Sequence, residues 1–301
     1  MPQDNSTFNI HKISEQSLDY LASNKIGFSR LSTNITGGVK EKGETVSVRL
    51  SGSLVAGDKT AGTKTAKQDA NYEKVTVTLN RWKSVKIGEN DLERTLKGVG
   101  DFESDHIASA FEALNEAVMT DVLSLATAAN GFDTFQTVSA ANAVTADTMA
   151  NIRRKLSENK VPSSNRLGIL SPEIIESLQT DGAIQNTAAF GNSTAVQDGK
   201  VERLSGISCF EYNGNIPSNS ENMVGIVAHP QAFAVAMRET AMPEAGTWAG
   251  QAISRVDPVS GLPFQIRRYY DMEDEEQVIE WSVFYGVAVG QSKAAIRVVS
   301  A

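Results

Sequence analysis

Histidine and cysteine are the residues of this 301-residue chain that most readily carry metal or nucleophilic chemistry. The three histidines, His11, His106 and His229, lie far apart, and none has a second ligand at the spacing of a metal site. The single cysteine, Cys209, lies in a strand-like pattern before Phe210, which predicts a buried structural thiol. One cysteine can form neither an intramolecular disulfide nor a thiolate metal cluster. We therefore expect no metal site.

Sequence motifs of catalysis and nucleotide binding do not occur. The chain contains no GxSxG elbow, no Walker loop and no GxGxxG turn after a strand. We therefore expect no catalytic residues and no cofactor, and a protein that is not an enzyme. A hydrolase with an unrecognised site is the enzymatic alternative, and the empty motif search argues against it.

The densest charge cluster is the acidic run at 271–276. It has two interpretations, a solvated hairpin tip or a socket for cations or for basic side chains of a neighbouring chain. It does not match a calcium loop, because no glycine stands at the sixth position after an aspartate. Arg267 and Arg268 precede the run and could pair within the hairpin or across a symmetry axis. The carboxylates are those of Asp271, Glu273, Asp274, Glu275 and Glu276.

The overall composition is that of a globular protein with an acidic balance. Hydrophobic residues make up 41 %, the formal net charge is −8 and the sequence pI is near 5.1. No apolar run approaches the roughly 18 residues of a membrane helix, and the N-terminal residues lack a secretory pattern, so we expect a cytoplasmic protein that binds no membrane. The negative charge argues against tight wrapping of nucleic acid but is compatible with enclosing it.

Two extended segments frame an unusual loop. Residues 45–50 and 75–79 each alternate apolar and polar side chains, as half-buried strands do. The intervening 51–71 is rich in Gly, Ala, Thr and Lys and far longer than the usual hairpin loop of about 2–5 residues. We therefore predict a long hairpin whose tip projects from the body. Its lysines are Lys59, Lys64 and Lys67.

The strongest helical pattern follows the hairpin. Apolar residues recur every three or four positions from about residue 103 to 129, which predicts a helix of roughly 40 Å. A shorter helix is expected around 90–96. The first 40 residues are polar and weakly patterned, and we leave open a loose terminus or an arm that orders on a neighbour.

The remaining chain mixes helices and strands, which gives an α+β fold. Helices are expected at 145–159, with Thr145 as its N-cap, and at 171–178, with Ser171 as its cap. Residues 180–205 have the composition of a surface loop. The other expected elements are strands at 166–170, 207–212, 223–228, 264–270, 278–285 and 294–299, and a helical turn at 230–234.

The order of these elements resembles the major capsid protein of tailed bacteriophages, the Hong Kong 97 fold. The resemblance spans residues 40 to 300; each stretch is weak alone, and their order makes the match fairly specific. The stretches are VTVTLNRWKSVKIGENDLERTL (75–96), FESDHIASAFEALNEAVMTDVLSLA (102–126), LSGISCFEYNGNIP (204–217), GIVAHPQAFAVAMRE (225–239), GLPFQIRRYYD (261–271) and FYGVAVGQSKAAIRVVS (284–300).

The resemblance implies a division into four parts and a structural role. The parts are an N-terminal arm (1–40), an extended β-hairpin loop (41–80), a peripheral domain with a long spine helix (81–135 and 255–285) and an axial domain (136–254 and 286–301). Members assemble into pentamers and hexamers that form an icosahedral shell around double-stranded DNA. The implied location is the virion capsid, assembled in the host cytoplasm.

The resemblance also implies partners. Because the spine pattern begins near residue 103, no room remains for a fused scaffolding segment, so we expect a separate scaffolding protein, together with a portal protein and a decoration protein as a further candidate. Some members crosslink a loop lysine to a peripheral asparagine, but the 264–285 hairpin has no asparagine, so we expect no such crosslink. The candidates for inter-subunit contact are Lys59, Lys64, Lys67, Arg267, Arg268, Asp271, Glu273, Asp274, Glu275 and Glu276.

Two further alternatives stay open at this point. An encapsulin-like shell, which encloses protein cargo, shares the same fold, and the chain alone does not distinguish the two. A carbohydrate-binding or adhesive β-protein belongs to a different class, and the long helical pattern at 103–129 argues against it.

Overall fold

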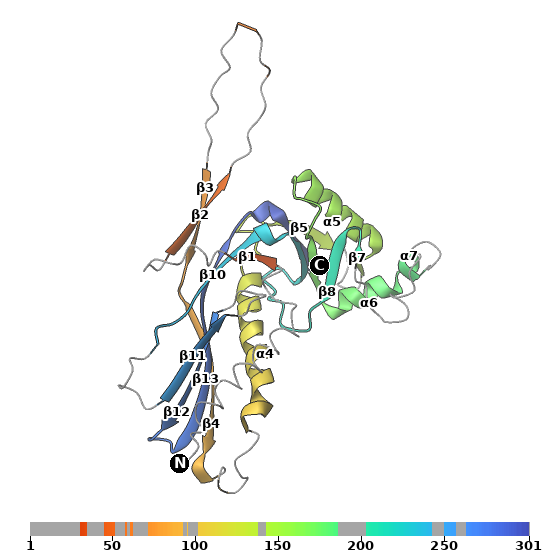
Figure 1. Cartoon of the computed structure of the whole chain (residues 1–301). Coiled ribbons are helices and arrows are strands. Elements are labelled where there is room, and N and C mark those ends of the chain that lie inside the picture. The colour runs from red at the N-terminus through yellow and green to blue at the C-terminus, as the bar shows by residue number, and fades with distance from the viewer. Residues whose placement is uncertain are drawn as a thin grey trace.

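The fold was obtained as a computed structural model with two six-stranded sheets and a two-stranded hairpin (Figure 1). The fold is therefore α+β, as predicted. Among the described residues, no helix is both long and apolar enough to span a membrane. The structure describes residues 31–34, 45–51, 58, 61–62, 72–92, 95, 102–137, 143–185, 203–242, 250–256 and 263–300.

The first sheet is organised around its longest strand, β13. This strand pairs with β4 along one side and with β12 and then β10 along the other. Strand β1 pairs with β10, and β11 pairs with β12. The strands are β1 (Ser32–Asn34), β4 (Arg81–Asn90), β10 (Phe233–Arg238), β11 (Gly250–Val256), β12 (Pro263–Asp271) and β13 (Glu276–Val289).

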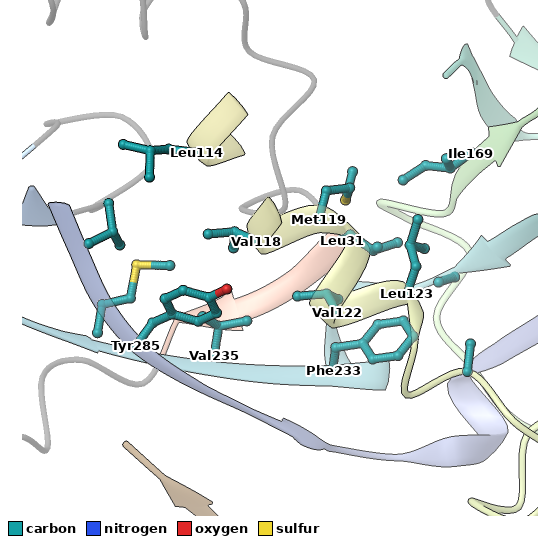
Figure 2. Close-up of a cluster of buried hydrophobic side chains, with 14 of the residues drawn as sticks. Leu31, Leu114, Val118, Met119, Val122, Leu123, Ile169, Phe233, Val235 and Tyr285 are labelled. Carbon is teal, nitrogen blue, oxygen red and sulfur yellow. The ribbon is translucent and has the colours of Figure 1, made fainter. Parts of the chain in front are cut away.

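Helix α4 (Phe102–Leu123) packs on one face of this sheet. Its buried side chains lie over Tyr285, Val235 and Phe233, as Figure 2 shows. Lower on the helix, the ring of Phe111 meets Phe264 edge-on at 5.2 Å between centroids. The buried residues of the helix that recur at helical spacing are Ile107, Phe111, Leu114, Val118 and Val122.

The helix ends earlier than the predicted residue 129. After Leu123 the backbone tightens, because the amides of Leu125 and Ala126 donate to carbonyls three residues back rather than four. The side chain of Asn130 then caps Leu125, donating to its carbonyl at 2.7 Å. With 22 residues the helix spans about 33 Å.

The opposite face of the first sheet carries the predicted hairpin. Strands β2 (Thr45–Ser51) and β3 (Tyr72–Thr78) pair antiparallel in unbroken register. Val46, Val75 and Val77 pack with Ala234 and Ala236 of β10 in a separate small core. The hairpin stem and α4 therefore sandwich the upper part of the sheet (Figure 1).

Gly286 of β13 is what lets the stem approach so closely. A Cβ at this position would lie 2.1 Å from the carbonyl oxygen of Thr78. No real side chain tolerates that separation, so only glycine fits where the chain leaving β3 crosses the sheet.

The second sheet has the order β5-β14-β9-β6-β8-β7 and is packed against two helices, α5 (Ala146–Glu158) and α6 (Pro172–Thr180). Gly182–Gln185 forms the short helix α7 within the predicted surface loop. The strands are β5 (Asp133–Thr137), β6 (Leu167–Leu170), β7 (Arg203–Leu204), β8 (Ile207–Glu211), β9 (Met223–Ala228) and β14 (Ala295–Ser300).

Both predicted N-cap residues stand where the sequence placed them, but they differ in their hydrogen bonds. Thr145 caps α5 as expected and forms a reciprocal capping box with Thr148. Ser171 is the N-cap residue of α6, as predicted, although its side chain makes no capping hydrogen bond. The helix starts there because Pro172 occupies its first turn, where the missing amide hydrogen costs nothing.

Two chain crossings join the sheets side by side. One runs from β9 through the 3-10 turn η3 (Pro230–Ala232) into β10, and the other runs from β13 through η4 (Ser292–Ala294) into β14. The amide of His229 donates to the carbonyl of Ala294 at 2.9 Å, and that of Gly290 donates to Ala232 at 2.9 Å. These two passages are thus tied together at one junction. The chain also passes from the first sheet to the second through α4, between β4 and β5.

Candidate inter-subunit contact surfaces

The acidic run forms the tip of the β12–β13 hairpin, as the sequence predicted. Asp271 pairs with Glu276 across the last rung of the ladder, and residues 272–275 make the turn. Asp271 Oδ1 accepts a hydrogen bond from the amide of Glu273 at 3.1 Å. Glu275 adopts the left-handed region with φ 54°, a conformation in which non-glycine residues are uncommon. The turn therefore has a defined shape.

Residues following β4 hold this tip from the side. The amide of Asp91 donates to the carbonyl of Glu275 at 3.2 Å, and the hydroxyl of Tyr270 donates to Asp91 Oδ2 at 2.6 Å. This hydrogen bond to Asp91 raises the pKa of Tyr270. Lys86 Nζ lies 3.6 Å from Asp271 Oδ2. Sequence reasoning did not bring Lys86 or Asp91 to the tip, because register between distant strands is not visible in the chain.

One exposed apolar side chain, that of Met272, lies in the turn of the tip. Met272 is 81 % exposed, the highest exposure among the large apolar side chains that the structure describes. Glu273, Asp274 and Glu275 beside it are exposed as well. The turn thus presents one apolar side chain beside three carboxylates.

The two predicted arginines lie on opposite faces of the sheet. Adjacent strand residues alternate in direction, and Arg268 stands opposite the buried Ile279 on the side of α4. Arg267 stands on the other face, where its Nε donates to Gln265 Oε1 at 2.9 Å. Its guanidinium carbon lies 5.9 Å from the ring centroid of Trp82. This distance is within the range of a cation–π interaction.

Trp82 is a surface feature that sequence reasoning missed. It is 57 % exposed on β4, although Trp is on average a highly buried residue. Its register partner is Phe284 of β13, and Phe284 is paired on its other side with Arg238 of β10. The only sequence signal was a tryptophan between two basic residues, and this cannot show which face of a strand is open.

The three loop lysines, Lys59, Lys64 and Lys67, lie outside the described residues. Of the loop, the structure describes Asp58, Ala61 and Gly62, and all three are exposed. The role of these lysines in contacts therefore stays a prediction.

A partly buried polar cluster fixes the spine helix to the sheet. Asp121 of α4 accepts a hydrogen bond from the Tyr285 hydroxyl at 2.5 Å and forms an ion pair with Arg81 at 2.6 Å. Tyr285 is 0 % exposed. Burial acts to raise the pKa of Asp121, but the hydrogen bond and the ion pair outweigh it and lower that pKa overall. One carboxylate thus joins α4, β13 and β4.

His229 and Cys209 are both buried in the fold. His229 is buried at the junction of the sheets, and its Nδ1 accepts from the amide of Gln231 at 3.3 Å. Burial, with the nearby charge of Arg166, lowers the pKa of His229. Cys209 is buried as predicted, and burial raises the pKa of its thiol to about 12. Within the described ranges, no three His, Cys, Asp or Glu residues group as metal ligands.

No family model and no curated protein matches this sequence. Solved structures match it closely in fold. A structure from Mycobacterium phage Che8 has a TM-score of 0.65 at 18 % identity and covers 90 % of each chain. The capsid structure of the cyanophage P-SCSP1u has a TM-score of 0.65 at 15 % identity, covering 91 % of this chain and 88 % of its own. The capsid asymmetric unit of cyanophage Pam1 gives 0.59 at 12 % identity, covering 89 % and 88 %.

These likenesses concern the fold, because the identities are low. The chain has the fold of phage capsid structures over about nine-tenths of its length. The resemblance to tailed-phage major capsid proteins that the sequence showed is confirmed at this level.

Proposed function

We propose that this chain is the major capsid protein of a tailed bacteriophage, a structural subunit and not an enzyme. In this proposal it assembles into pentamers and hexamers that form an icosahedral shell around double-stranded DNA in the virion. The observation that carries the proposal is the match in fold to phage capsid structures across about 90 % of both chains.

The proposal assigns a role to each layer of the fold. We place the first sheet and α4 in the peripheral domain and the second sheet with α5 and α6 in the axial domain. Strand β10 and most of β11 come from the 136–254 range assigned to the axial domain, but both strands pair in the first sheet, so we move them to the peripheral domain. The hairpin of β2 and β3 is the extended loop.

A shell subunit of this kind gains its stability from many modest contacts. Closed symmetric assembly repeats each contact around a ring, so weak contacts add up. The loop lysines and the acidic tip supply opposite charges for such contacts, which favour correct register more than affinity. The net charge of −8 suits a wall that encloses DNA without binding it tightly.

The proposal includes partners. A separate scaffolding protein directs assembly, a portal protein occupies one vertex, and a decoration protein is a further candidate for the outer surface. Assembly takes place in the host cytoplasm. The shell is held without isopeptide crosslinks, so boiled particles should give a monomer band on a denaturing gel, and a ladder of multimers would contradict this.

Electron microscopy of the purified recombinant chain, with and without its co-expressed scaffolding protein, tests the proposal. We expect capsomers or closed shells of uniform size. A chain that stays monomeric under all conditions would refute the proposal. In particles from infected cells we expect nuclease-protected DNA, whereas a protein cargo would indicate an encapsulin-like compartment.

A further inference from the structure

Two exposed apolar side chains lie near opposite ends of β4, in opposite electrostatic surroundings. Met272 is the first residue of the turn in the acidic tip and is 81 % exposed. Trp82, 57 % exposed, stands near the other end of β4 beside two arginines. Single exposed apolar side chains are common on protein surfaces, so what distinguishes these two is the opposite charge of their neighbours.

The basic neighbours of Trp82 follow from strand register. Arg238, Phe284 and Trp82 form one row across β10, β13 and β4, so their side chains leave the sheet on the same face. Arg267 reaches the Trp82 ring from β12. Glu280 stands opposite Arg267 on this face, so the two arginines outnumber one carboxylate. We call Trp82, Arg238 and Arg267 the Trp82 patch.

The tip and the patch of one copy cannot touch each other. Glu276 is in register with Asn90, and Phe284 is in register with Trp82, so eight residues of β4 separate the two features. An extended strand rises about 3.3 Å per residue, which places them about 26 Å apart. Any contact between them must therefore join two copies.

Both features are organised before they meet. The tip is fixed by the hydrogen bonds of Asp271 with Glu273 and of Asp91 with Glu275. The Trp82 patch is fixed by Arg267, which is held by Gln265 and faces the indole ring. Contacts between pre-ordered groups cost less conformational entropy than contacts between mobile ones.

We propose that the Met272 tip of one copy docks on the Trp82 patch of a second copy. The carboxylates of Glu273, Asp274 and Glu275 then face Arg238 and Arg267. The thioether of Met272 meets the indole ring, a contact that sulfur and aromatic groups favour. Because two different surfaces meet, the contact is head-to-tail, and it closes a ring when the rotation between copies allows. The inference rests on the proposed capsid function.

Cysteine crosslinking in assembled particles tests the contact. Particles are assembled from a mixture of a Trp82→Cys chain and a Met272→Cys chain and are then oxidised. We expect a covalent dimer on a non-reducing gel from the mixture and monomers from either variant alone. Both substituted positions are exposed, so folding should be preserved, and the native Cys209 is buried and stays out of the reaction.

Matched pairs identify other occupants of the patch. Val256→Cys, at a position 48 % exposed, is the control partner for Met272→Cys and should give no dimer. Ala61→Cys places a thiol in the hairpin loop, so a dimer between it and Trp82→Cys, in place of the expected one, would overturn the proposal. A dimer from Met272→Cys alone would show that tips meet tips and would overturn it too.

The outcome separates this inference from the function it rests on. If the chains form shells but the mixture gives no dimer, the contact is rejected and the capsid function stands. If the unsubstituted chain forms no shell or capsomer, the capsid function fails and the contact falls with it. A charge reversal, Asp274→Lys, should lower the yield of the dimer severalfold, and Arg238→Glu in the partner chain should restore it.

Discussion

The carboxylate of Asp121 offers a sharp test of how α4 is attached to the sheet. It accepts from the Tyr285 hydroxyl at 2.5 Å and pairs with Arg81 at 2.6 Å. Substituting Tyr285→Phe keeps the buried ring and removes only the hydroxyl. Hydrogen bonds to charged groups contribute about 1.5–3 kcal/mol, so we expect a loss of about 2 kcal/mol in the free energy of unfolding.

The substitution Asp121→Ala should cost more. It leaves the buried Tyr285 hydroxyl without an acceptor, which costs about 1–3 kcal/mol, and it removes the partner of Arg81. That ion pair is partly exposed and contributes about 0–1 kcal/mol. The double variant has no hydroxyl that could be left without an acceptor. Its loss in the free energy of unfolding should therefore be smaller than the sum of the two single losses by about 1–2 kcal/mol.

Guanidinium unfolding of the unassembled chain, followed by tryptophan fluorescence, measures these differences. Tyr270→Phe is the matched control, because its hydroxyl also donates to an aspartate, Asp91, at 2.6 Å but on the surface. It should leave the free energy of unfolding nearly unchanged, because surface substitutions of this kind have small effects. Additive losses in the double variant, or equal losses for Tyr270→Phe and Tyr285→Phe, would refute the reasoning.

The same cluster predicts a dependence on pH. The pKa of Asp121 in the folded state lies below its ordinary value. Its contribution to the free energy of unfolding is therefore present above the carboxyl pKa of the unfolded chain, and it is lost as pH falls through the pKa of the folded state. The penalty of Tyr285→Phe should therefore be full at pH 7 and shrink in acid below about pH 4. A penalty that stays constant through this range would contradict the assignment of the charge to Asp121.

Three further predictions concern other parts of the fold. Gly286→Ala forces a Cβ to within 2.1 Å of the Thr78 carbonyl oxygen and should destabilise the chain by about 1–3 kcal/mol in denaturant unfolding; Gly182→Ala, with open space around it, should be nearly neutral. The lowered pKa of His229 means that its contribution to the free energy of unfolding is present above the unfolded pKa of about 6.5 and is lost as pH falls. Melting curves should show that His229→Gln removes part of the loss of stability in acid. An unchanged pH profile would contradict this. Replacing Lys59, Lys64 and Lys67 by Glu should leave the circular dichroism of the monomer unchanged but impair shell assembly or heat resistance, and normal particles would exclude a role for these lysines.

The elements that could be predicted are those with one buried face. The hairpin of β2 and β3 alternates because one side packs on the sheet, and α5 shows its apolar stripe at Met149, Ile152 and Leu156. Strand β13 was predicted only in its central part, and the structure extends it to Val289. Sequence patterns report burial, so they succeed where burial is one-sided.

Strand β10 shows why the rest could not be predicted. Its residues Phe233–Met237 are all buried, because α4 covers one face and the hairpin stem covers the other. A strand buried on both faces has no alternation to read, and the sequence instead suggested a helical turn through residue 234. That turn ends at Ala232, where β10 begins.

The candidate contact residues show the same limit at the surface. The acidic hairpin tip was predicted because charge clusters and turn residues are local in sequence. The side chains that hold or complement it come from distant positions, as Asp91 does for Tyr270. Only the fold brings such residues together, and the exposure of Trp82 likewise depends on which face of β4 the helix covers.

The capsid function is tested most directly by an electron cryomicroscopy reconstruction of particles formed by this chain with its scaffolding protein. The proposal predicts rings of five and six copies in a closed icosahedral shell, each copy showing α4, the two sheets and the hairpin of β2 and β3. A chain that remains a monomer, or forms only an open aggregate without five- and six-fold rings, would contradict it.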